Sequence, residues 1–99
     1  MPRATLLIDA KKVYADGSIL QLKLWELKPP NRVRGSAHGL KYSLFYGREG
    51  LRILAYDNEA GKGDHVHRGD VETPYRFTTY EKLLDDFLTE VGTLRGGQL

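Results

Sequence analysis

The sequence predicts an α+β domain, in which an antiparallel sheet of four or five strands packs one face against a C-terminal amphipathic helix. Two observations support this prediction. Short runs of alternating apolar and polar residues, separated by turn residues, extend as far as Asp57, which is typical of half-buried strands. Apolar residues after position 80 instead recur at helical spacing. Because the 99 residues contain no repeat and no linker, we expect a single domain that spans residues 1–99.

The first two strands are expected at residues 4–14 and 18–28, where β-branched, aromatic and alternating apolar residues are frequent. Asp16-Gly17 between them predicts a hairpin turn, because glycine accepts the positive φ that tight turns require. Pro29-Pro30 is expected to end the second strand, since proline cannot donate to the ladder of hydrogen bonds between strands. The segment that follows, as far as Gly39, is predicted to be a loop.

Two more strands are expected at residues 40–47 and 51–57, joined by a glycine-containing turn. Alternation in the first of these places Tyr42 and Tyr46 on one face. The second strand runs into a polar stretch, residues 57–68, which is predicted to be a loop. Residues 73–77 are predicted to form either a short fifth strand or an extended lead-in to the helix.

The C-terminal helix has a predicted start, an apolar stripe and a predicted end. Thr78 and Glu81 match a capping box, in which the two side chains satisfy free backbone N–H groups at the start of a helix. Gly96-Gly97 is expected to end the helix. The apolar stripe that should face the sheet consists of Leu83, Leu84, Phe87, Leu88, Val91 and Leu94.

The composition excludes several classes of protein. The chain has no cysteine, so disulfides and thiolate metal sites are excluded, and a reducing compartment is suitable. No apolar run reaches the roughly 20 residues of a membrane span, and residues 1–4 lack the apolar core of a signal peptide. We therefore expect a cytoplasmic protein with no membrane partner.

Charge is unevenly distributed along the chain, although the net charge is only +2. Residues 28–52 carry a net charge of +5, whereas residues 57–76 carry −2. Clustered lysine and arginine are the usual electrostatic signature of a phosphate-backbone partner, so RNA is the expected partner. A solvated charged surface explains the same pattern, and a tyrosine offered for base stacking can instead pack in the core. The candidate substrate-binding residues are Arg32, Arg34, Lys41, Arg48, Arg52, Tyr56 and Arg68.

The polar stretch contains the candidate catalytic residues. His65 and His67 are separated by one residue, so on an extended segment both imidazoles leave the same face. Histidine has a reference pKa of about 6.5, which suits a general base and a general acid for RNA cleavage. The alternative is a polar loop whose imidazoles cap backbone groups. The candidate catalytic residues are His65, His67, Asp57, Lys62 and Asp64.

The neighbours of the two histidines support more than one chemistry. Asp57 can orient an imidazole or bind a metal, or it can simply form an Asx turn. Gly61 and Gly63 flank Lys62 and free the backbone to direct N–H groups at an anion. Metal-independent acid–base catalysis with no cofactor is the favoured prediction. A site for Mg²⁺ or Mn²⁺ through oxygens, or for Zn²⁺ or Ni²⁺ through nitrogens, is the second mechanism.

Four short motifs together resemble the TumE-like toxins of bacterial toxin–antitoxin pairs. They are the Tyr-Ser-Leu-Phe-Tyr run at residues 42–46, Tyr-Asp-Asn at 56–58, Asp-His-Val-His at 64–67, and Tyr-Arg-Phe at 75–77 before the leucine-rich helix. The resemblance covers roughly residues 4–95. It implies a small cytosolic toxin that a helix-turn-helix antitoxin neutralises by direct binding.

Ribonuclease activity, in contrast, is inferred from residue chemistry and not from the resemblance. The alternative is a non-catalytic module that binds nucleic acid or protein through a basic face.

Overall fold

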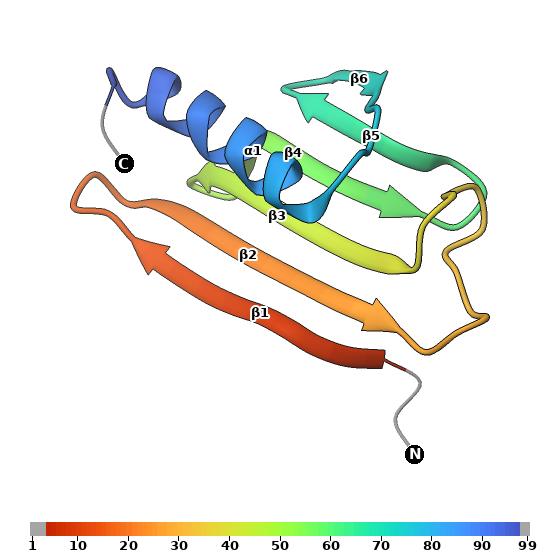
Figure 1. The fold of residues 1–99 in the computed structure, drawn as a ribbon. Coiled ribbons are helices and arrows are strands. Elements are labelled where there is room, and N and C mark those ends of the chain that lie inside the picture. Colours follow the sequence, from red (N-terminus) through yellow and green to blue (C-terminus); the bar gives the residue numbers. More distant parts are fainter. Residues whose placement is uncertain (1–3, 98–99) are drawn as a thin grey trace.

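One six-stranded antiparallel sheet carries a single helix on one face in the computed structural model, which describes residues 4–97 (Figure 1). Each strand pairs with the strands that precede and follow it in the sequence, so the sheet order is also the chain order. The sheet has more strands than the predicted four or five. Its elements are β1 (Ala4–Val13), β2 (Ser18–Leu27), β3 (Leu40–Arg48), β4 (Leu51–Glu59), β5 (Gly63–Arg68), β6 (Val71–Pro74) and α1 (Tyr80–Leu94).

The extra strand comes from the polar stretch, which was predicted to be a loop. Residues 57–68 form the end of β4, a short turn and the whole of β5, with Asp57 paired to His65 and Glu59 paired to Gly63. The loop prediction was wrong because β5 has only one apolar residue, Val66, and its other face is occupied by histidines, so hydrophobic alternation is hidden.

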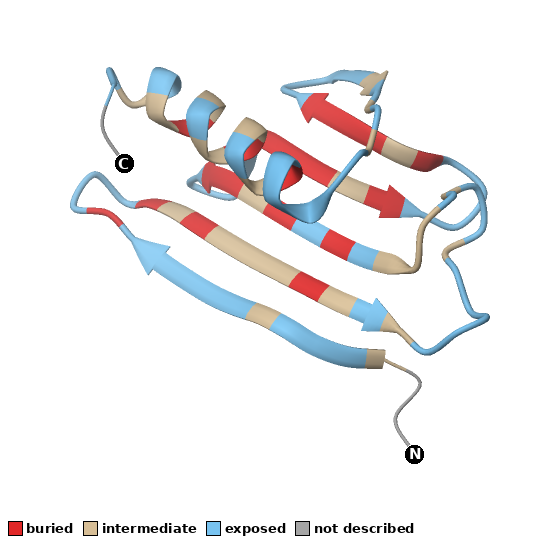
Figure 2. Cartoon of the chain, viewed as in Figure 1, coloured by how far each residue is buried: buried red, intermediate tan, exposed pale blue. Residues whose placement is uncertain are grey.

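The helix-facing side of the sheet forms the core. Buried bands cross the middle strands under α1, whereas β1 is mostly exposed (Figure 2). Tyr42 and Tyr46 share one face of β3, as predicted, and that face lies under the helix. Phe87 of α1 packs edge-on against Tyr56, with 5.4 Å between ring centroids. Because side chains alternate, residues next to these in each strand lie on the opposite side of the sheet, here called the outer face.

The helix begins one residue later than the predicted capping box. Thr79 is the N-cap, and its hydroxyl accepts a hydrogen bond from the Lys82 N–H at 3.1 Å. A reciprocal capping box is absent because the residue three positions after Thr79 is a lysine and not a glutamate. Within residues 4–97, no helix is long and apolar enough to cross a membrane.

The segment between β2 and β3 crosses directly over the turn between β4 and β5. The Gly61 N–H donates a hydrogen bond to the Arg34 carbonyl at 2.7 Å. A Cβ atom on Gly35 would lie 2.8 Å from the Gly63 nitrogen, and Gly35 and Gly63 have φ values of 97° and 74°. The crossing therefore requires glycine on both segments, and it holds the arginine-bearing segment beside the end of β4.

Candidate functional site

Strand pairing brings two histidines and one aspartate together on the outer face. Asp57 in β4 lies opposite His65 in β5, and Ala55 lies opposite His67. Val66, between the two histidines, belongs to the core under α1, so both imidazoles leave the sheet on the side away from the helix. Asp57, His65 and His67 are here called the histidine–aspartate cluster.

The side chains of the cluster converge on one carboxylate oxygen. His65 Nε2 lies 2.6 Å from Asp57 Oδ1, and His67 Nε2 lies 3.4 Å from the same oxygen. The two imidazoles meet edge to face, with their centroids 4.6 Å apart. Two nitrogens and one oxygen are thus directed at a common point.

A second carboxylate, that of Glu72, lies within 4 Å of both imidazoles. Glu72 in β6 is paired with His67, and its carboxylate oxygens lie 3.9 Å from His65 Nε2 and 3.7 Å from His67 Nδ1. Glu72 was not among the residues that the sequence patterns indicated. The signal that could have found it is the Gly69-Asp70 turn, which predicts a hairpin whose returning strand places residue 72 opposite residue 67.

The cluster is largely enclosed, and three of its polar atoms have no hydrogen-bond partner among residues 4–97. The side chains of His65 and His67 are 4% and 8% exposed, and that of Asp57 is 20% exposed. His65 Nδ1 lies 2.9 Å from the Gly63 carbonyl oxygen, which can only accept, so Nδ1 carries the proton and Nε2 has a free lone pair in the neutral ring. Among the residues that the structure describes, none makes a well-aligned hydrogen bond to either Nε2 atom or to Asp57 Oδ1.

Lys62 and the glycines around it do not form an open anion site. The Gly61 N–H donates to Arg34, and the Lys62 N–H donates to the Glu59 carbonyl at 3.1 Å. The Lys62 side chain is 57% exposed, and its ammonium lies 3.8 Å from a carboxylate oxygen of Glu72. Lys62 therefore lies at the rim of the cluster, between the carboxylates of Glu59 and Glu72.

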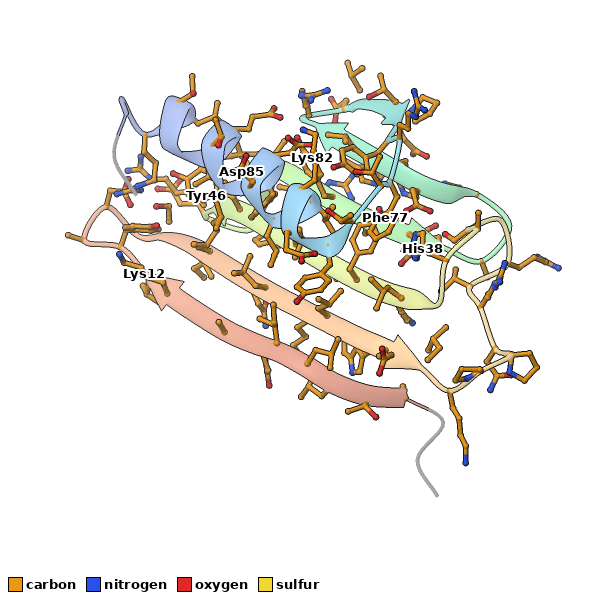
Figure 3. The ribbon with its side chains drawn as sticks, in the orientation of Figure 1. Lys12, His38, Tyr46, Phe77, Lys82 and Asp85 are labelled. Carbon is orange, nitrogen blue, oxygen red and sulfur yellow. The ribbon has the colours of Figure 1, made fainter. Side chains whose placement is uncertain are left out.

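Asp64, the remaining predicted catalytic residue, faces the other side of the sheet. Its carboxylate accepts hydrogen bonds from Tyr42 Oη at 2.8 Å, from His38 Nε2 at 2.6 Å and from the Ser36 hydroxyl. Burial, followed by the hydrogen bond to Asp64, raises the pKa of Tyr42. His38 stacks on Phe77 with 3.8 Å between ring centroids, and the two rings lie side by side in Figure 3. This network ties the β2–β3 segment to β3 and β5.

Three of the predicted substrate-binding residues gather beside the cluster. Arg32, Arg34 and Lys41 line a groove of about 750 Å³ that also includes Asp57 and Glu59. The three cations come from the β2–β3 segment and the start of β3, and they share the lining of this groove with Asp57. Arg52 also lies on the outer face. It pairs with Gly47, which is two residues after Phe45 and so on the same side of the sheet as Phe45 and its partner Ala55.

The other predicted substrate-binding residues lie elsewhere. Tyr56 and Arg68 face α1, where the Tyr56 hydroxyl donates to Glu90 at 2.7 Å and Arg68 Nε donates to Glu90 at 2.6 Å. Burial, with the hydrogen bond to Glu90, raises the pKa of Tyr56, and Arg68 lowers the pKa of Glu90. Arg48 lies near Asp16, in a separate depression at the far end of the helix. None of these three side chains lies beside the histidine–aspartate cluster.

Comparison with known proteins identifies the family. The model of the family described as Toxin TumE matches residues 2–95, which is nearly the whole chain. No curated protein and no solved structure matches it. The family match confirms the resemblance that the sequence motifs indicated. The chain therefore belongs to the TumE toxin family.

Proposed function

We propose that this toxin acts on RNA and cleaves its phosphodiester backbone at the histidine–aspartate cluster, and that a helix-turn-helix antitoxin neutralises it. One observation supports the proposed activity above all. A nearly enclosed pair of imidazoles shares a carboxylate, Asp57, which also lines a groove with Arg32, Arg34 and Lys41. The residues that we propose for catalysis and for phosphate binding therefore meet at Asp57, although they come from segments far apart in the sequence.

The groove has the chemistry that a nucleic-acid strand needs. Guanidinium groups bind phosphate oxygens in a bidentate manner, and lysine adds a point charge. During cleavage, negative charge accumulates on the phosphate, and cations already in place stabilise that charge without reorganising. The Asp57 carboxylate alone would repel phosphate, so its position among these cations favours a role in the reaction over a role in substrate binding.

The burial of the imidazoles limits direct proton transfer between the cluster and RNA. Asp57 is the most exposed of the three side chains, whereas the Nε2 atoms of His65 and His67 are enclosed. Direct proton exchange between these nitrogens and RNA therefore requires the cluster to open. The arrangement is better suited to chemistry in which the imidazoles act on a third group held between them and Asp57.

The proposed activity can be tested with purified protein and end-labelled single-stranded RNA. We expect the wild-type protein to produce defined fragments and Asp57→Asn to lose most of the cleavage. Asp85→Asn provides the matched control, because it makes the same substitution at an exposed position of α1 (Figure 3), on the opposite side of the sheet from the cluster. If Asp57→Asn cleaves RNA at the wild-type rate, the cluster is not the site. If the wild type cleaves no RNA and Asp57→Asn remains toxic in cells, the non-catalytic binding module is the better interpretation.

The proposed partner has its own test. We expect the antitoxin to copurify with the toxin when the two are expressed together, and to suppress RNA cleavage at equimolar concentration. An antitoxin that restores growth without binding the toxin would contradict direct neutralisation.

A further inference from the structure

We infer that the histidine–aspartate cluster binds one divalent transition-metal ion, with His65 Nε2, His67 Nε2 and Asp57 Oδ1 as its ligands. The inference deepens the proposed function, because it supplies the third group on which the imidazoles would act, and in that respect it rests on the proposal. Metal binding itself can be measured without RNA, so the two proposals can fail separately.

Distance is the first support for the inference. The three ligand atoms lie within 4.8 Å of one another, and His67 Nε2 is 3.4 Å from Asp57 Oδ1. Metal–ligand bonds of about 2.0–2.2 Å place neighbouring ligands roughly 3.0–3.5 Å apart. The 2.6 Å between His65 Nε2 and Asp57 Oδ1 is shorter, so these two atoms have to separate by roughly half an ångström. Asp57 is the most exposed of the three side chains, so we expect it to be the one that shifts.

The orientation of His65 is the second support. Its Nδ1–H group donates to the Gly63 carbonyl, so the ring is fixed with the Nε2 lone pair directed at the cluster. Metal-binding histidines commonly donate their other ring N–H to a backbone carbonyl or a carboxylate in this way. Glu72 lies 3.7 Å from His67 Nδ1 and is placed to serve the same purpose for the second ring.

The unsatisfied polar atoms are the third and strongest support. Both Nε2 atoms and Asp57 Oδ1 are buried without a hydrogen-bond partner in the part of the chain that the structure describes. Leaving a buried polar atom unsatisfied costs about 1–3 kcal/mol, so three such atoms close together are destabilising. A single proton can link Asp57 to only one imidazole at a time. A cation between the three atoms satisfies all of them at once.

The donor set indicates which ions fit. Two imidazole nitrogens and one carboxylate oxygen suit Zn²⁺, Ni²⁺ or Mn²⁺, whereas Mg²⁺ prefers oxygen ligands and keeps several waters. Zn²⁺ should bind more tightly than Mn²⁺ at such a site, following the general order of affinities. Three protein ligands leave at least one coordination position for water or a phosphate oxygen, as in catalytic zinc sites.

Calorimetry on the metal-free protein, without RNA, is the first test. We expect one equivalent of Zn²⁺ to bind and the thermal midpoint to rise on binding. His65→Gln and His67→Gln should each weaken binding at least about 100-fold, since even outer-shell changes cost about 10–100-fold. Glu72→Gln should weaken Zn²⁺ binding by about 10–100-fold. Asp85→Asn should bind as the wild type does.

Nuclear magnetic resonance of the wild-type protein avoids any variant that fails to fold. With ¹⁵N-labelled histidine, Zn²⁺ should shift the Nε2 signals of His65 and His67 and leave those of His38 unchanged, because His38 Nε2 is already bonded to Asp64. The inference is overturned if no equivalent binds, or if His38 is the histidine that shifts. RNA cleavage without metal binding would contradict the metal site and leave the proposed function standing. Metal binding without RNA cleavage would contradict the proposed function and leave the metal site standing.

Discussion

Replacing Phe87 with alanine should show how much of the stability comes from the single helix. The Phe87 side chain is fully buried, and it packs edge-on against Tyr56 with the ring planes at 79°. Truncation of a buried phenylalanine costs about 3–5 kcal/mol, which includes the cavity that remains. The aromatic pair itself is typically worth about 0.5–1.5 kcal/mol beyond burial, so we expect a loss of about 4–5 kcal/mol. This is a large part of the about 5–15 kcal/mol that stabilises a typical domain.

Urea denaturation monitored by circular dichroism measures this loss, and a matched variant controls for helix propensity. Leu94→Ala alters the same helix at a side chain that is 51% exposed, so the free energy of unfolding should fall by less than about 1 kcal/mol. In thermal denaturation, Phe87→Ala should lower the midpoint by at least about 15 °C, at about 4–8 °C per kcal/mol for a domain of this size. If the two variants lose similar amounts, the packing of α1 on the sheet is not what stabilises the fold.

Three further substitutions test the Asp64 network, the Arg68–Glu90 ion pair and the cationic groove. Asp64→Asn should lower the free energy of unfolding by about 2–4 kcal/mol, because the buried Tyr42 hydroxyl loses a charged acceptor; a variant that is inactive but fully stable would instead assign Asp64 to the chemistry. Glu90→Gln should destabilise the protein by about 1–3 kcal/mol at pH 7. Arg68 lowers the pKa of Glu90 below its ordinary 4.5, so the difference from wild type should vanish as the pH falls through that lowered pKa, and a constant difference down to low pH would contradict the ion pair. Lys41→Gln should weaken RNA binding and reduce the slope of log affinity against log salt by about 0.7, and an unchanged slope would place the RNA elsewhere.

The sequence was sufficient to predict the elements that have strong periodic patterns. The two hairpins before Asp57 follow from alternation and glycine turns, and the helix follows from an apolar stripe whose members Leu83, Phe87 and Val91 are all buried. These signals are local, because each depends on residues within one or two turns of the chain. The N-cap is Thr79 and not the predicted Thr78, because two consecutive threonines offer equivalent side chains.

The candidate site was only partly predictable. His65, His67 and Asp57 were singled out by residue type and spacing, and the i, i+2 rule placed the two rings on one face once the segment was extended. The sequence did not indicate that this segment is a strand, because one apolar residue, Val66, is too weak a signal. Burial of the rings was therefore not expected.

The sequence by itself determined the fold class, the helix and the presence of two closely spaced imidazoles near an acid. Tertiary structure alone decided which charges share a face. Asp64 and His65 are adjacent in the chain, yet Asp64 joins the network on the helix side, where His38 is bonded to it, and His65 joins the cluster on the outer face. The physical reason is that neighbouring side chains in a strand point in opposite directions, so their partners are set by the register of β4 against β5 and by the crossing of Gly35 over Gly63.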